Sequence, residues 1–245
     1  MAKNILSVSA DAKTSKGEKR GYLTGILYMT PADGSGREVC KFRTAGCTAG
    51  CLSTAGRGAF NSVQSARLAK TMQYFEDRDS FWRNLVYSIE SLARRAEREG
   101  LTPCVRLNGT SDLPYERMPV KIGGERIASN IFEMFPDIRF YDYTKYPNTE
   151  RSREGLPLNY DLTFSYHEEC TVQDLLRELR TGRVAVVFDT PKGKSLPLVF
   201  GGAGVLDADD TDLRFLEPAG VICGLRAKGK ARKDTSGFVQ RARCS

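Results

Sequence analysis

Short apolar runs that alternate with helical patterns constrain the fold of this chain more than any other feature of its sequence. The plainest run is Val184–Phe188, which is followed at once by Asp189. Continuous apolar strands are typical of a parallel sheet covered on both faces, because neither face of such a strand meets water. The alternation of these runs with helices therefore predicts an α/β fold.

Each expected element is placed by its apolar residues and by the turn residues around it. We expect strands at residues 22–29, 103–107, 138–141, 161–165, 184–188 and 220–225, and residues 38–42 are either a further short strand or the lead into the cysteine loop. We expect helices at residues 59–75, 80–100, 125–135 and 172–179, and we expect the acidic run 207–212 to begin a further helix. Five or six usable strands are fewer than the eight of a complete β/α barrel. The expected architecture is therefore an irregular or partial barrel with an N-terminal cysteine loop.

Length and hydropathy bound the organisation of the chain. Its 245 residues suffice for one barrel-sized domain, which we place at residues 21–245 behind a flexible basic arm at residues 1–20. No apolar run is long enough for a membrane-spanning helix, and the first 20 residues lack the apolar stretch of a secretory signal. We therefore expect a cytoplasmic protein without a membrane partner.

Charge and histidine content narrow the range of functions. Lys and Arg number 37 against 30 Asp and Glu, which gives a net charge of +7. Such a charge suits a polyanionic partner such as nucleic acid, although an ordinary basic protein carries as much. His167 is the single histidine, which excludes metal hydrolases that need two histidine ligands.

Three of the seven cysteines, Cys40, Cys47 and Cys51, fall on one glycine-rich loop. With His167 they predict a Cys₃His zinc site, and with Cys170 instead they would give a Cys₄ site. A [4Fe–4S] cluster with three cysteine ligands is the competing interpretation. Three reduced thiols without a metal are the plain structural alternative.

Polar side chains follow the predicted strands, where a β/α barrel has its active face. Asn108, Ser111 and Asp112 follow one strand, and Asp142 follows the next. Two facing carboxylates, Asp112 and Asp142, permit general acid–base catalysis or a nucleophile with its base. The alternative is a turn whose side chains satisfy their own backbone.

Further residues are expected to hold a nucleic-acid substrate. Tyr143 offers a ring that can stack on a base, Lys145 can reach a phosphate, and Asp189 ends another strand. Cations expected to contact nucleic-acid phosphates are Arg57, Arg226, Lys228, Lys230 and Arg232. The alternative for the last four is a solvated charged tail.

The chain resembles a family of phage and phage-derived proteins named after gene product 88. The resemblance rests on motifs at residues 46–52, 55–58, 66–71, 106–112, 140–145, 159–165 and 224–229. The loops of this family resemble transglycosylases that exchange guanine for a 7-deazaguanine in phage DNA, which are relatives of the tRNA-guanine transglycosylases. They also resemble iron–sulfur enzymes that use S-adenosylmethionine.

The transglycosylase resemblance implies a β/α barrel, a Cys₃His zinc and two aspartates, one of which attacks the sugar carbon. Asp112 and Asp142 are the available pair here, with Asp189 in reserve. Two departures stand out: the cysteines lie near the N-terminus, and the diagnostic sequences of the tRNA enzymes are not evident. The cysteine spacing also departs from that of the radical enzymes.

These features together predict a base-exchanging DNA transglycosylase, a transferase that uses a deazapurine base and Zn²⁺ in the cytoplasm of an infected host cell. One alternative is a radical enzyme with a [4Fe–4S] cluster and S-adenosylmethionine. The other is a basic single-strand nucleic-acid-binding protein without enzymatic activity. RNA in place of DNA, the identity of the nucleophilic aspartate and the oligomeric state stay open.

Overall fold

A computed structural model describes residues 2–9 and 12–241, and the chain divides into two compact units. The first unit comprises Met1–Cys40, Asn61–Asp142 and Leu156–Asp161. The second unit comprises Lys41–Phe60, Tyr143–Gly155 and Leu162–Ser245. The strands β6 and β7 contribute residues to both units.

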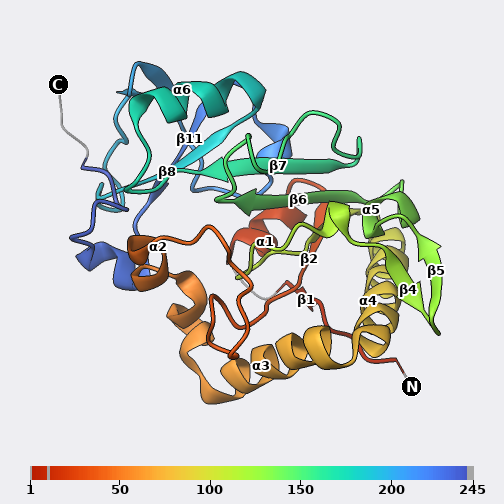
Figure 1. The fold of residues 1–245 in the computed structure, drawn as a ribbon. Helices are drawn as coiled ribbons and strands as arrows, with labels where there is room; N and C mark the ends of the chain where they lie inside the picture. Colours follow the sequence, from red (N-terminus) through yellow and green to blue (C-terminus); the bar gives the residue numbers. More distant parts are fainter. Residues whose placement is uncertain (1, 10–11, 242–245) are drawn as a thin grey trace. The chain divides into compact units, whose positions relative to one another are not determined.

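The first unit is built on mostly parallel strands with helices packed against them (Figure 1). Its strands are neighbours in the order β1 (Ser7–Val8), β2 (Tyr22–Ile26), β3 (Thr102–Arg106) and β6 (Arg139–Thr144). Strand β1 runs antiparallel to β2, and the pairs β2–β3 and β3–β6 are parallel. The remaining elements are α1 (Ala12–Glu18), α3 (Asn61–Glu76), α4 (Arg78–Glu99), η3 (Tyr115–Arg117), α5 (Ile131–Met134) and the antiparallel hairpin of β4 (Val120–Ile122) and β5 (Glu125–Ala128).

Helix α4 illustrates how local signals place an element in this unit. Its apolar stripe is buried and packs against β2 and β3. The carboxylate of Asp77 accepts a hydrogen bond from the Ser80 backbone amide at 3.1 Å, so Asp77 is the N-terminal cap. Gly100 ends the helix in the left-handed conformation (φ 65°), which costs glycine little.

The second unit also holds mostly parallel strands. Their order is β7 (Tyr160–Ser165), β8 (Val184–Phe188), β11 (Ile222–Arg226), β10 (Ala203–Asp207) and β9 (Val199–Phe200), and only β9 runs antiparallel to its neighbour. Its helices are α2 (Ala45–Ala49) and α6 (Val172–Thr181), with short 3₁₀ turns η1 (Leu52–Thr54), η2 (Gly56–Ala59), η4 (Arg214–Leu216) and η5 (Gly229–Lys233).

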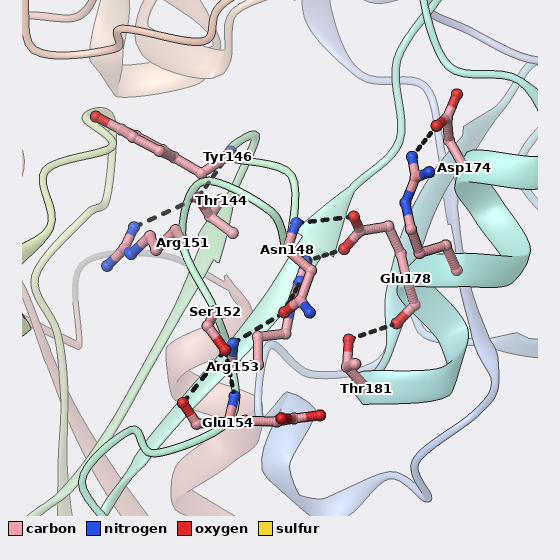
Figure 2. Close-up of polar contacts among 11 residues, drawn as sticks. Thr144, Tyr146, Asn148, Arg151, Ser152, Arg153, Glu154, Asp174, Glu178 and Thr181 are labelled. Atoms are coloured by element: carbon pink, nitrogen blue, oxygen red, sulfur yellow. Dashed lines mark hydrogen bonds and ion pairs between the residues drawn. The ribbon is translucent and has the colours of Figure 1, made fainter.

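Helix α6 covers the apolar core of the second unit. Leu175 and Leu179 pack with strand residues that include Phe164 and Val186. The helix begins with a capping box, in which Thr171 and Asp174 exchange hydrogen bonds between side chain and backbone. Figure 2 shows the loop before β7 fastened to α6 through Glu178.

The expected α/β class is confirmed, and the sheet is mostly parallel. The expected barrel is not: in the described chain β1 pairs only with β2, and β9 only with β10, so neither end closes onto another strand. The two-residue antiparallel strand β1 ends the strand series of the first unit, and antiparallel β9 ends that of the second unit.

Several local predictions are wrong. Residues 125–135 form β5 and the short helix α5 rather than one helix, because Gly123 and Gly124 both adopt positive φ and close the β4–β5 hairpin. Of the two expectations for residues 38–42, the strand is wrong: they form no strand and lead into the cysteine loop. Asp207 ends strand β10 rather than beginning a helix.

The described part of the segment expected to be a flexible basic arm packs against the rest of the first unit. Ile5 and Leu6 are buried, the β1 strand pairs with β2, and helix α1 packs against β2. The backbone amide of Ile5 donates to the Ser88 hydroxyl of α4 at 2.9 Å. Buried apolar side chains, strand pairing and this hydrogen bond together anchor a segment whose composition is polar.

Candidate functional site

The carboxylate of Asp142 organises the loop that follows β3. It accepts hydrogen bonds from the backbone amide of Asn108 at 2.7 Å and from the side-chain amide of Asn108 at 3.3 Å. The hydroxyl of Tyr160 lies 3.3 Å from the same carboxylate. Asp142 is 1% exposed, so these donors replace the water that the charge loses on burial.

Asn108 then holds the loop by its other polar atoms. Its side-chain oxygen accepts from the hydroxyl of Ser111 at 2.9 Å and from the backbone amide of Leu113 at 2.8 Å. Its side-chain nitrogen donates to the Leu113 carbonyl at 3.0 Å. Asn108 and Ser111, expected to bind substrate, therefore shape residues 108–113.

Asp112 lies on the same loop, three residues before η3 begins at Tyr115, and is 7% exposed. Its backbone amide donates to the Val39 carbonyl at 2.8 Å. Cys40 adjoins the same loop, with its sulfur 3.9 Å from the Thr110 carbonyl. The two expected catalytic carboxylates thus belong to one neighbourhood, in which Asp142 serves as the buried anchor.

In the second unit, Lys145 lies at the end of β6 and is buried. Its ammonium group donates to the carbonyl of Ser165 at 3.1 Å and to the hydroxyl of Ser165 at 3.0 Å. It also lies 4.9 Å from the centre of the Phe238 ring. Lys145 therefore holds the ends of β6 and β7 together and covers Phe238.

His167 follows β7 close to Lys145. Burial lowers the pKa of His167 to about 4, and the positive charge of Lys145 adds to the shift. The imidazole is therefore neutral at pH 7. Its buried Nδ1 has no hydrogen-bond partner among the described residues.

Glu168 connects this turn to the cysteine helix α2. Its carboxylate accepts from the hydroxyl of Thr44 at 2.9 Å and from the backbone amide of Gly46 at 2.6 Å. Thr44 in turn caps α2 by accepting from the Cys47 backbone amide at 3.2 Å. Glu168 and Thr44 were not predicted from the sequence, although a threonine three residues before Cys47 is a recognisable N-cap signal.

The predicted metal ligands fall in different units. Cys40 belongs to the first unit, whereas Cys47, Cys51 and His167 belong to the second. Within residues 2–9 and 12–241, no three histidine, cysteine or acidic side chains form a group that could hold a metal ion. The described side chains therefore do not present a preformed site, and zinc or cluster binding stays a prediction.

Tyr143 and Asp189, which were also expected to contact the substrate, lie in different environments. Tyr143 packs against the buried cluster of Ala185, Ala208 and Cys223. Asp189 is exposed after β8, and its backbone amide donates to the Gln240 carbonyl at 3.0 Å. Tyr143 thus contributes to the core of the second unit, while Asp189 faces solvent.

The predicted phosphate-binding cations divide into two groups. The guanidinium of Arg226 bonds to the carboxylates of Asp207 and Asp209 at 2.9 and 3.0 Å, and Lys228 lies 3.2 Å from Asp209. Arg57, on η2, and Lys230 and Arg232, on η5, are exposed. The acidic run therefore neutralises part of the basic segment and leaves the η5 cations to solvent.

Comparisons with known proteins give one match. No curated protein and no solved structure matches this chain significantly. Within the described residues, no helix combines the length and the apolar character needed to cross a bilayer. The family model of gene product 88 matches residues 4–242, almost the whole chain. The chain therefore belongs to the gene product 88 family.

Proposed function

We propose that this protein is a nucleic-acid-modifying enzyme that replaces guanine in DNA by a 7-deazaguanine. The observation that supports this most is the buried pair of Asn108 and Asp142, which holds the loop carrying Asp112. A carboxylate fixed on a short loop at the carboxyl end of a parallel strand suits chemistry on a bound ligand.

The geometry separates the roles of the two aspartates. The Asp142 carboxylate is 1% exposed and already accepts from Asn108 and Tyr160, so it is poorly placed to attack a substrate carbon. We therefore assign Asp142 as a positioning residue. Asp112, on the loop that Asp142 holds, is the candidate nucleophile.

The proposed reaction proceeds in two displacements at the sugar carbon. A carboxylate oxygen of Asp112 bonds to C1′ while the bond from C1′ to guanine breaks, and guanine leaves with the bonding electrons and takes a proton from solvent. The incoming deazaguanine loses a proton to solvent, bonds to C1′ and releases the carboxylate. No step of this sequence passes through a metal ion.

Binding of the nucleic acid is assigned to the second unit by its charge. Lys230, Arg232 and Arg57 are exposed and suit phosphate contacts, whereas Arg226 is paired with Asp207 and Asp209. Substrate contacts by Tyr143, Lys145 and Asp189 stay predictions. Zinc at Cys40, Cys47, Cys51 and His167 stays a prediction as well.

The experiment is incorporation of a radiolabelled base into polymer. Purified protein is incubated with labelled 7-deazaguanine or guanine and with single-stranded DNA, duplex DNA or RNA, and the label retained in the polymer is counted. We expect the wild type to incorporate label into DNA and Asp112→Asn to lose incorporation while it keeps DNA binding.

Other results select other functions. Incorporation by Asp112→Asn at the wild-type rate contradicts the catalytic assignment. If no label is incorporated into any of the three polymers, the result contradicts base exchange. In that case, the visible absorbance of an iron–sulfur cluster after anaerobic purification identifies the radical-enzyme alternative. Nucleic-acid binding without incorporation and without such a cluster identifies a binding protein.

A further inference from the structure

We infer that the second unit binds single-stranded nucleic acid on one basic–aromatic surface, in which Phe60 stacks on an unpaired base. The surface comprises Arg57, Phe60, Lys230, Arg232 and Lys233. The inference deepens the proposed function, because it rests on a nucleic-acid substrate and specifies the strand state of that substrate.

The cations on η5 are exposed because the turn is anchored by its middle residue. Ala231 is 4% exposed and lies beside Gly50, where an added Cβ would come within 3.3 Å of it. Burial of this methyl group leaves the flanking side chains of Lys230, Arg232 and Lys233 in solvent. Three cations are thus displayed on one short 3₁₀ turn.

The cysteine loop lies directly against this turn although the two segments are far apart in the sequence. The 3₁₀ turn η1 contacts η5. Gly229 has a positive φ of 56°, and an added Cβ there would lie 3.1 Å from the Cβ of Ala55. Because Ala55 joins η1 to η2, the 3₁₀ turn η2 begins beside η5.

Phe60 closes η2 and is 61% exposed. Its backbone amide donates to the Arg57 carbonyl at 3.2 Å, so a ring and a cation are displayed by one turn. Leu52 on η1 is 57% exposed as well. An exposed phenyl ring contributes little to folding, but a ring beside a cation on one turn suits the stacking of bases of a single strand.

Among the described residues, no acidic side chain forms an ion pair with Arg57, Lys230 or Lys233, in contrast to Arg226 and Lys228. Unneutralised cations favour a polyanion. The ring selects a single strand over a duplex, because duplex bases are already stacked on one another.

The test is fluorescence anisotropy with the full chain and a labelled DNA strand of about 16 nucleotides, the upper site size of such platforms. The same strand annealed to its complement serves as the duplex probe. We expect tighter binding to the single strand. Phe60→Ala should weaken binding to the single strand by roughly 5- to 100-fold, which is the effect of losing the stacking of one base on an aromatic ring. Binding to the duplex should stay unchanged.

Matched variants separate stacking from folding and from charge. Phe60→Trp should restore single-strand binding, and Leu198→Ala, which removes a side chain that is 84% exposed in the same unit, should bind as the wild type does. The combined change of Lys230, Arg232 and Lys233 to Ala should lower the salt slope of binding by roughly 2, since each phosphate contact on a single strand adds about 0.7. Lys192→Ala, an exposed cation elsewhere in the unit, should leave this slope unchanged.

Equal affinity for single strand and duplex, or full single-strand binding by Phe60→Ala, would overturn the inference. So would preferential binding to phosphatidylserine vesicles over the single strand, because a basic surface with exposed apolar residues also suits an anionic membrane. The proposed function fails separately: a wild type that binds single strands through Phe60 yet incorporates no base contradicts base exchange and leaves this surface assigned.

Discussion

Asp142 accepts two hydrogen bonds from Asn108, one from its backbone amide at 2.7 Å and one from its side chain at 3.3 Å. Asn108, which lies in the loop after β3, therefore links this loop to the buried carboxylate of Asp142 in β6. The pair fixes residues 108–113 whatever reaction that loop supports.

Asp142→Asn should destabilise the protein by about 2–3 kcal/mol. The substitution keeps the shape of the side chain but removes the buried charge and turns an amide toward donor groups that then lack an acceptor. Urea unfolding measures the change. Asp137→Asn, an exposed carboxylate in the same unit, should stay within about 0.5 kcal/mol of the wild type. Equal stability of the two variants would show that the network is dispensable.

Glu178→Ala should lower the free energy of unfolding by about 3–5 kcal/mol, because it removes the carboxylate that pairs with the buried cation of Arg153 (Figure 2). The side chains of Arg153 and Glu178 are 4% and 1% exposed, and Glu178 also accepts from the Asn148 backbone amide at 2.9 Å. The double change Arg153→Met with Glu178→Leu should recover part of the loss. Glu154→Ala, an exposed control, should change little in the same unfolding assay.

Lys70 should make the protein more stable as the pH rises from 8 to 10.5. Burial lowers the pKa of Lys70 from 10.5 to about 8, and the charge of Arg67 adds to this. In that window the unfolded chain binds more protons than the folded chain, so the free energy of unfolding rises with pH, by about 2–3 kcal/mol from this residue.

Lys70→Met should remove this rise and stabilise the protein at pH 7, where the wild type holds the buried charge. Lys121→Met, at an exposed position of the same unit, serves as the control. The difference in urea unfolding between each variant and the wild type, measured at pH 7 and pH 10, isolates the contribution. An identical pH dependence in Lys70→Met and wild type would contradict the assignment.

Metal content tests the cysteine prediction. If the loop holds zinc, the wild type should contain stoichiometric zinc that is lost in Cys47→Ser and Cys51→Ser, because zinc needs the thiolates. Cys104→Ser, at a buried strand position with a thiol pKa raised to about 12 by burial, serves as the control. Iron with sulfide in place of zinc points to the radical enzyme, and a metal-free wild type contradicts both metal predictions.

Elements with strong local signals were predictable from the sequence. Val184–Phe188 is β8 as expected, and the stripe that ends at Gly100 is helix α4. Thr171 caps α6 through Asp174, as a threonine before an acidic first turn indicates. Each of these depends on residues within a few positions of one another.

Relationships between distant segments were not predictable. Arg226 was expected to contact phosphate because it begins a basic run, but Asp207 and Asp209 reach it from the end of a neighbouring strand. Gly123 and Gly124 permit a hairpin where a helix was expected. The sequence shows where charges lie and how hydrophobic residues repeat, whereas the formation of ion pairs depends on which strands become neighbours in the fold.

Glu168→Ala should raise the rate at which Cys47 and Cys51 react with iodoacetamide. The carboxylate holds the first turn of α2 through the Thr44 hydroxyl and the Gly46 amide, and a five-residue helix has few bonds of its own to replace these contacts. Loss of the anchor should let α2 open more often and expose the thiols to the reagent. Mass spectrometry of the labelled peptides measures the rates. Glu169→Ala, an exposed acidic neighbour, should label as the wild type does, and equal rates in all three proteins would show that Glu168 does not hold the cysteine helix.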